Sequence, residues 1–267
     1  MANKNSVSNY EQQFYLSGVL LSGVTSIDGN CAISESPINI VGKGFVYPIR
    51  QQPLVGNFTI DKYFIGEEIL LNYTGDNHMN GSIHYGDKSF GFESGYLTEY
   101  SFSANIGSIP TARVSIDAYG NIGSGISASG NLPHPQVEIA NQGSISMNVA
   151  GHETNRITEF SYNLRIDRSP VYVIGSPFPV QVDRVFPIVQ EASFTMEVDN
   201  YEIKSFSDFL SSPEQQDITF SIKNPINNLE IQEFKIPKAR LINTSLVSSS
   251  EDLMTISLSY IGHTNKK

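Results

Sequence analysis

The sequence predicts an all-β fold, because its apolar residues alternate with polar or small ones and helical patterns are almost absent. This period of two is clearest in five segments: 100–106, 160–166, 193–198, 218–222 and 253–260. Clusters of Gly, Pro, Asn and Asp separate such segments, at 75–81, 85–88, 119–121 and 224–228. Short strands punctuated by turns indicate two tandem antiparallel β-sandwich or barrel domains with at most one or two short helices.

Two further segments have their own patterns. The apolar run at 14–24 is expected to form an early strand. It is too short and too rich in Ser and Gly for a membrane-spanning helix, which needs about 20 apolar residues, and it lacks the features of a secretory signal. The best helical pattern is at 205–211, where Ser205 or Ser207 can cap a short helix that Pro213 ends. We expect a soluble chain made in a reducing cytoplasm.

A Gly- and Ser-rich stretch at 120–130, followed by Pro133 and Pro135, interrupts the strand pattern. Such a composition cannot form a packed core, so we expect a domain boundary or an exposed loop there. The predicted domains are an N-terminal domain at 1–130 and a C-terminal domain at 131–267.

Charged residues are scarce, at 16% of the chain, against an ordinary share of about 25%. The formal net charge of −10 divides evenly, since residues 1–130 hold 11 acids and 6 bases and residues 131–267 hold 16 acids and 11 bases. Nucleic-acid-binding domains usually carry a basic patch. Sequence-specific DNA binding is therefore not expected, and we interpret Lys266 and Lys267 as a solvated tail.

The histidines show no metal-ligand spacing and are interpreted as surface residues in or beside turns; they are His78, His84, His134, His152 and His263. The segment 75–81 resembles a calcium loop in composition alone, because it has one acid, Asp76, and no Glu at the twelfth position. Cys31 is expected to be a buried thiol, and as the one cysteine it excludes an intrachain disulfide.

Other combinations of reactive residues are equally weak. Glu67-Glu68 and Glu251-Asp252 are interpreted as solvent-facing acids at strand ends, because adjacent side chains in a strand point to opposite faces. Gly42-Lys43-Gly44 lacks the third glycine and the helix of a phosphate-binding loop. We therefore expect a protein that is not an enzyme, with no catalytic, cofactor-binding or metal residues.

An internal similarity relates residues 97–110 (LTEYSFSANIGSIP) to residues 157–170 (ITEFSYNLRIDRSP) without a gap. Five positions are identical: Thr98/Thr158, Glu99/Glu159, Ser101/Ser161, Ile106/Ile166 and Pro110/Pro170. Three more are conservative replacements that keep the apolar face. The similarity predicts a duplicated strand-and-turn unit, with chance similarity between two strands as the alternative.

Three segments resemble tail structural proteins of tailed phages. Residues 98–120 are similar to a hairpin of those proteins, in which a Ser- and aromatic-rich strand leads through a turn to a second strand. Residues 157–203 resemble their second half, in which an Arg-containing strand leads through a Pro-rich turn to Asp183-Arg184-Val185-Phe186-Pro187. Residues 238–262 resemble the last hairpin of tail-tube domains. The resemblance covers a little over half of the chain, and the first ninety residues match poorly.

The resemblance implies a major tail-tube protein located in the virion. Domains of that family contain two packed antiparallel sheets with a flanking helix, and six domains form a ring. Two copies per chain imply trimeric, pseudo-hexameric rings, and one copy implies hexameric rings; stacked rings form the conduit for genome DNA during ejection. The implied partners are further copies of the chain, the tape measure, terminator and distal tail proteins, and DNA passing non-specifically, with no membrane insertion.

Strand edges suit such an assembly, because they pair with a neighbour's edges through main-chain hydrogen bonds. Residues 36–57 are expected to form a loop that is mobile in the free subunit and becomes ordered against the next ring. A mildly acidic lumen would let DNA slide. Two alternatives stay open: a receptor- or carbohydrate-binding β-sandwich (an adhesin), and a ring at the neck, tube terminus or baseplate of the same virion.

Overall fold

The computed structural model describes residues 12–32, 35–42, 44–50, 54–128, 145–149, 152–154, 156–197, 215–224, 226–227, 229–248 and 254–266. Within them the protein is built from antiparallel strands, so the predicted all-β class is confirmed. One 3-10 helix, η2 (Ile69–Tyr73), is present in this part of the chain. No helix in the described ranges is long and apolar enough to cross a membrane. The helix predicted at 205–211 lies outside them.

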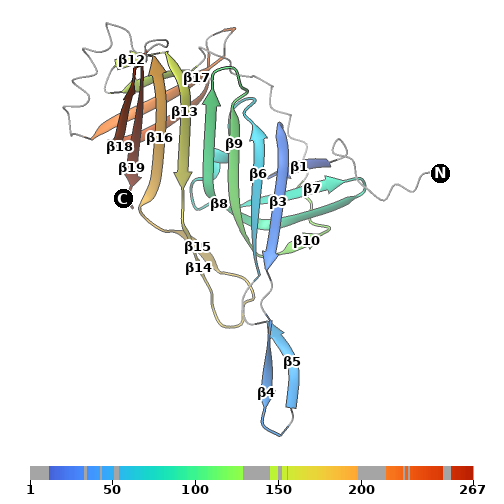
Figure 1. The fold of residues 1–267 in the computed structure, drawn as a ribbon. Coiled ribbons are helices and arrows are strands. Elements are labelled where there is room, and N and C mark those ends of the chain that lie inside the picture. Colours follow the sequence, from blue (N-terminus) through green and yellow to red (C-terminus); the bar gives the residue numbers. More distant parts are fainter. Residues whose placement is uncertain are drawn as a thin grey trace.

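Eight strands form a continuous antiparallel sheet, which we call the main sheet (Figure 1). Their spatial order is β3 (Val24–Ala32), β6 (Val55–Tyr63), β9 (Thr111–Tyr119), β8 (Lys88–Asn105), β13 (Ile157–Arg165), β16 (Ile188–Glu197), β19 (Thr255–Thr264) and β18 (Glu230–Val247). The central neighbours β8 and β13 come from the two sides of the predicted boundary at residue 130. The exposed loop expected at 120–130 is wrong for its described part, because Ile122–Ser124 form a strand that pairs with β8 and Ala128 is buried. Residues 129–144 lie outside the described ranges, so the division at 130 stays a prediction.

The two longest strands, β8 and β18, each belong to two layers. The first half of β8 pairs with β7 (Met79–Tyr85) and β10 (Ile122–Ser124), and β7 pairs with β1 (Gln12–Leu16), beside β2 (Val19–Leu20). The first half of β18 pairs with β17 (Gln216–Lys223), which continues through β11 (Ile145–Val149) to β12 (His152–Thr154). The hydrophobic core lies between the main sheet and these second layers.

Two hairpin arms are inserted in the chain between strands that are neighbours in the main sheet, at corresponding places in its two halves. The hairpin of β4 (Glu35–Ile40) and β5 (Gly44–Arg50) lies between β3 and β6 in the chain, and that of β14 (Arg168–Val171) and β15 (Gln181–Arg184) lies between β13 and β16. Both leave the same rim of the main sheet (Figure 1). The loop predicted at 36–57 is therefore wrong for most of its length, because Glu35–Ile40 and Gly44–Arg50 form a two-stranded antiparallel ladder there.

The element order β1 to β9 recurs, with the same pairing partners, as β11 to β19. Even the irregularities recur. The β3–β6 pairing has a bulge at Thr25 and the β13–β16 pairing has one at Thr158. Thr25 Oγ1 donates to the Asp61 carbonyl at 3.0 Å, and Thr158 Oγ1 donates to the Thr195 carbonyl at 3.1 Å. Bulges are specific structural features rather than random irregularities. Because the pairing order and the bulges both recur, the fold contains the same structural unit twice.

The long strands β8 and β18 also have bulges at equivalent places in the two units. The β8–β9 pairing shifts between Leu97 and Glu99, and the β18–β19 pairing shifts between Leu241 and Asn243. Aligning these bulges matches Ser101 of β8 with Ser245 of β18. Through their partners in β7 and β17, Phe90 matches Phe234 in the first halves of the same strands.

The sequence similarity between 97–110 and 157–170 therefore matched the wrong strands. These segments form adjacent antiparallel strands, with Ser103 opposite Ser161, and they occupy different places in the repeated unit. The structural repeat instead aligns residues 24–42 with 157–175, which share Thr25/Thr158, Ser36/Ser169, Pro37/Pro170 and Gly42/Gly175. Gly42 and Gly175 both have a positive φ, 84° and 94°, at the hairpin turns of the two arms.

The predicted early strand at 14–24 is also corrected. Ser17 and Gly18 both adopt positive φ angles, 48° and 86°, and turn the chain between β1 and β2. The apolar run thus forms a small hairpin followed by the start of β3.

Aromatic rings join the two units beneath β8 and β13. The Phe234 ring, on β18, lies 5.2 Å from Phe102 on β8 and 4.8 Å from Tyr162 on β13, between ring centroids. Glu68 adds a polar link, since its amide donates to Gln232 Oε1 on β18 at 3.1 Å. The second layer of the C-terminal unit therefore covers the strand junction between the units.

Replacing Phe234 tests this packing. Phe234→Ala is expected to lower the free energy of unfolding by about 3–5 kcal/mol, because it leaves a cavity beneath the junction. Phe90→Ala, at the matching but half-buried position, is expected to cost clearly less in the isolated chain. Urea unfolding of both variants at low protein concentration gives the comparison, and equal losses would contradict it.

Candidate functional site

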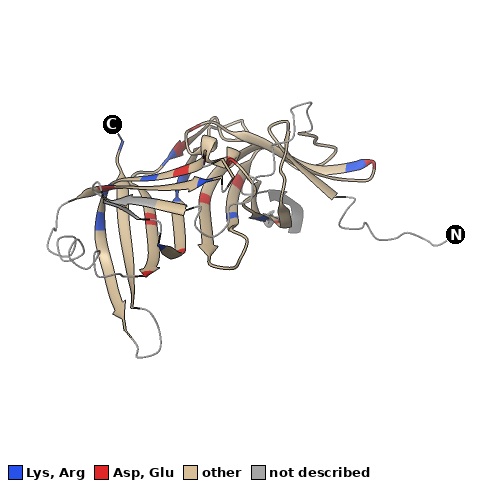
Figure 2. Cartoon of the chain, turned by 90° about the horizontal axis from the view of Figure 1, so that it is seen from above, with Lys and Arg blue, Asp and Glu red and all other residues tan. Residues whose placement is uncertain are grey.

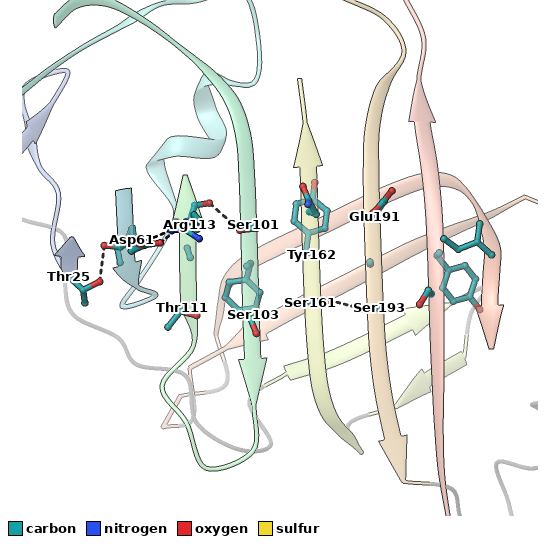
Figure 3. Close-up of a pocket in the computed structure, with 18 residues that line it drawn as sticks. Thr25, Asp61, Ser101, Ser103, Thr111, Arg113, Ser161, Tyr162, Glu191 and Ser193 are labelled. Atoms are coloured by element: carbon teal, nitrogen blue, oxygen red, sulfur yellow. Dashed lines mark hydrogen bonds and ion pairs between the residues drawn. The ribbon is translucent and has the colours of Figure 1, made fainter. Parts of the chain in front are cut away.

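A hollow of about 640 Å³ lies on the solvent side of the main sheet. All eight strands contribute residues to its lining, from Thr25 on β3 to Ile242 on β18 (Figure 3). A hollow that spans every strand means that the sheet is curved with this side inward. We call this surface the concave face.

Strand alternation decides which side chains reach the concave face. On β6, Phe58 and Ile60 are buried while Thr59 and Asp61 are half-buried on the opposite side. On β13, Phe160 and Tyr162 are buried and Ser161 is on the concave side. One face of each strand thus builds the core and the other presents small polar groups to solvent.

Strand register aligns these polar groups in rows that cross the sheet. One row contains Thr111, Ser103, Ser161, Ser193, Ser259 and Asn243. Two pairs of neighbouring hydroxyls on this face bond to each other, with 2.6 Å between Ser161 Oγ and Ser193 Oγ, and 2.8 Å between Thr195 Oγ1 and Ser257 Oγ. Hydroxyls paired in this way are neutral and less available to a ligand.

Acids outnumber bases on the described part of the concave face. By register, the acids there are Asp28, Asp61, Glu99, Asp117, Glu159, Glu191 and Glu197, and the arginines are Arg113, Arg165 and Arg240. Arg113 Nε lies 3.0 Å from Asp61 Oδ1, with 62% of the arginine side chain exposed. Such exposed pairs contribute less than about 1 kcal/mol. Basic residues are scattered along the described strands rather than gathered in one place (Figure 2).

The tyrosines buried beneath the concave face are uncharged at neutral pH. Burial raises the pKa of Tyr162 to about 12, and burial raises the pKa of Tyr260 to about 12. Burial, together with the nearby negative charge of Glu68, raises the pKa of Tyr100 well above its usual value. These phenols stay protonated, so they provide neither a base nor a nucleophile.

The histidines considered from sequence do not come together in the described residues. His84 Nε2 lies 2.9 Å from Ser82 Oγ, and its ring contacts Tyr15 on the neighbouring strand. His78 lies near Tyr96, His263 is at the exposed end of β19, His152 is in β12, and His134 lies outside the described ranges. No group of three or more His, Cys, Asp or Glu in those ranges is arranged to hold a metal ion.

Two expectations about single residues are wrong. Cys31 is exposed rather than buried, because it lies on β3, which has no neighbour on its outer side among the described residues. Glu68 is buried rather than solvent-facing, whereas Glu67 is exposed. Glu68 Oε2 pairs with Lys62 Nζ at 2.9 Å, and its Oε1 accepts from the Leu70 amide at the start of η2. Glu251 and Asp252 lie outside the described residues.

Asp76, the one acid of the segment that resembles a calcium loop, pairs with arginines instead. Arg184 Nε donates to Asp76 Oδ1 at 2.7 Å, and Arg168 Nη1 lies 3.9 Å from the same oxygen. Arg168 also donates to the Leu97 and Gly75 carbonyls; burial lowers its pKa, and Asp76 opposes this shift. The cluster fastens the base of the β14–β15 arm to the N-terminal unit.

The residues that sequence reasoning missed are the Ser and Thr rows of the concave face. Their signal was present in the sequence as the polar half of each alternating strand, but the strand register that aligns them across the sheet depends on distant segments.

No family model matches the chain, and no curated protein matches it.

The raised pKa of Tyr162 predicts how the free energy of unfolding depends on pH. Its folded pKa is raised above the usual value of about 10, so its contribution is complete below pH 10 and is lost as the pH rises through 12. We expect a loss of about 2 kcal/mol from this residue, given 1.36 kcal/mol per unit of pKa shift. Urea unfolding between pH 8 and 12 measures it. Tyr162→Phe should flatten part of the decline, and a profile identical to that of the wild type would contradict the assignment.

Proposed function

We propose that this chain is a structural subunit of a phage tail tube, which forms rings that stack into the conduit for genome DNA. The observation that carries the proposal is the repeated unit, whose two copies join edge to edge, while the outer edges β3 and β18 have no further partner strand among the described residues. Such contacts are heterologous and add copies head to tail until a ring closes. Closure removes the exposed edges that would otherwise promote aggregation.

The number of chains in the ring follows from the repeat and the resemblance together. Tail-tube rings of the resembling family contain six domains, and this chain contains the unit twice. We therefore favour three chains with pseudo-sixfold symmetry over six chains. The main sheets would then continue around a closed barrel with the concave face inward.

The concave face suits the lining of a DNA conduit. Duplex DNA carries one negative charge per about 1.7 Å of axis, so a basic wall would retain it. Rows of hydroxyls with an excess of acids offer no such grip. Repulsion reaches only about 8 Å at physiological salt, so it acts when DNA approaches the wall.

The hairpin arms provide the contact between stacked rings in this proposal. Both leave the same rim at corresponding places in the two units (Figure 1). They would reach the adjacent ring, in the role first assigned to a loop at 36–57. The proposal locates the chain in the virion as a non-enzymatic component, beside the tape measure, terminator and distal tail proteins and without membrane insertion.

A carbohydrate-binding adhesin is the second candidate, because the hollow is of ligand size and is lined by hydroxyl and carboxylate groups. A ring at the neck, tube terminus or baseplate would use the same edge-to-edge contacts without forming a long tube.

Electron microscopy of the purified protein distinguishes these candidates. We expect rings with a central hole and tubes of uniform diameter built from them. Isolated rings that never stack would favour the neck or baseplate. A monomer at all concentrations that binds sugars on a glycan array would contradict the tube and favour the adhesin.

Charge reversal on the concave face tests the lumen. Tubes of Glu159→Lys/Glu191→Lys are expected to retain short duplex DNA in co-sedimentation at low salt and to release it as salt rises, because added cations bind phosphate by releasing counterions. Wild-type tubes should retain none. Exposed Lys235→Glu, on the first half of β18, serves as a charge-changing control. DNA retention equal to that of the wild type would contradict the assignment of this face to the lumen.

A further inference from the structure

Two strand edges of the main sheet are open in the described residues. β3 pairs with β6 alone, and the second half of β18 pairs with β19 alone. Each edge presents main-chain N–H and C=O groups on its outer side, which is a template for pairing with another chain.

The repeat matches these open strands with two strands that pair inside the chain. β3 occupies the place of β13, since the Thr25 and Thr158 bulges align. The second half of β18 occupies the place of the second half of β8, since their bulges against β19 and β9 align. The strands β8 and β13 pair antiparallel at the centre of the sheet, with Ser101 opposite Asn163 and Tyr100 opposite Leu164.

We infer that β18 of one copy pairs with β3 of the next copy in the register of the internal β8–β13 pairing. Transferring that register places Ser245 opposite Asn30, Thr244 opposite Cys31, and Leu246 opposite Gly29. The inference deepens the proposed function, on which it rests, by naming the residues that join the subunits.

Side-chain character at the open edges supports this register. Leu246 takes the place of Phe102, which is 1% exposed, yet Leu246 is 57% exposed. Ile27 takes the place of Phe160, and Phe90 takes the place of Phe234; both are half-buried where their counterparts are buried. At these three positions, core-type residues remain partly in water where the next copy is absent.

The packing of β3 also fits. Gly29 stands where Tyr162 stands in the second unit, and the Phe58 ring lies 2.9 Å from where a Cβ of this exposed glycine would be. Leu246 of the next copy would lie opposite this glycine and contact Phe58 and Phe90. The stretch from Asn243 to Val247 has no charged residue, so it lacks the lysines that normally prevent edge pairing.

Disulfide cross-linking tests the register. Inside the chain, the Ile166 amide donates to the Thr98 carbonyl, so alternation makes Asn163 and Ser101 a non-hydrogen-bonded pair. Their counterparts Asn30 and Ser245 should therefore have Cα atoms about 4.5 Å apart, within the disulfide range of about 4.4–6.8 Å. In a Cys31→Ser background, Asn30→Cys/Ser245→Cys is expected to form intermolecular disulfides on mild oxidation, ending at a cross-linked species of three chains.

Matched controls move one cysteine along the same face. Asn30→Cys/Asn243→Cys and Asn30→Cys/Val247→Cys place the two cysteines diagonally, with Cα atoms about 7–8 Å apart, and should give about tenfold less cross-linking. Equal or stronger cross-linking of a diagonal pair overturns the register. Rings and tubes without cross-linking of the predicted pair would overturn it and leave the tube proposal standing. Cross-linked rings that never stack would support the register and reject the tube.

A second variant tests the edge without cysteines. Thr244 takes the place of Tyr100, whose main-chain groups face β13, so its own N–H should point toward the next copy. Thr244→Pro is expected to leave the circular dichroism spectrum unchanged and to abolish ring formation, whereas Thr244→Ala should keep it. Rings formed by Thr244→Pro would overturn the inference.

Discussion

Main-chain pairing between β8 and β13 is the interaction on which the rest of the structure depends. It carries one sheet across both copies of the repeated unit, from Glu159 opposite Asn105 to Arg165 opposite Glu99. Without it the units would be separate two-layer sandwiches, each with two exposed edges. The ring of Phe234 and the bond between Glu68 and Gln232 fasten this junction from beneath.

The same pairing explains the two faces of the main sheet. Because register is maintained across eight strands, the apolar half of each alternating pattern forms one continuous core and the polar half forms one continuous concave face. Buried tyrosines under that face stay neutral, so its charge comes from exposed carboxylates and arginines. The concave face of the described strands therefore combines hydroxyl groups with an excess of acids over bases.

Predictions from the sequence are confirmed where they depend on a local pattern, and are wrong where a strand distant in the chain determines the burial or the pairing of a residue. The alternation at 218–222 and 160–166 correctly predicted β17 and β13. The thiol of Cys31 was expected to be buried from residue type alone, yet its strand is an edge. Glu68 was expected to face solvent, yet Lys62 from β6 and the η2 amide compensate its buried charge. The similarity between 97–110 and 157–170 predicts a duplicated unit, yet these segments are adjacent central strands of one sheet and occupy different places in the repeated unit.

By itself, the sequence determined the strand class, the turns and the low charge, because these depend on side-chain alternation and composition over a few residues. Tertiary structure alone decided which strands are equivalent, which edges stay open and which hydroxyls align in rows. Those features depend on hydrogen-bond register between segments far apart in the chain, and shifting a strand by one residue would exchange its two faces without changing a single local preference.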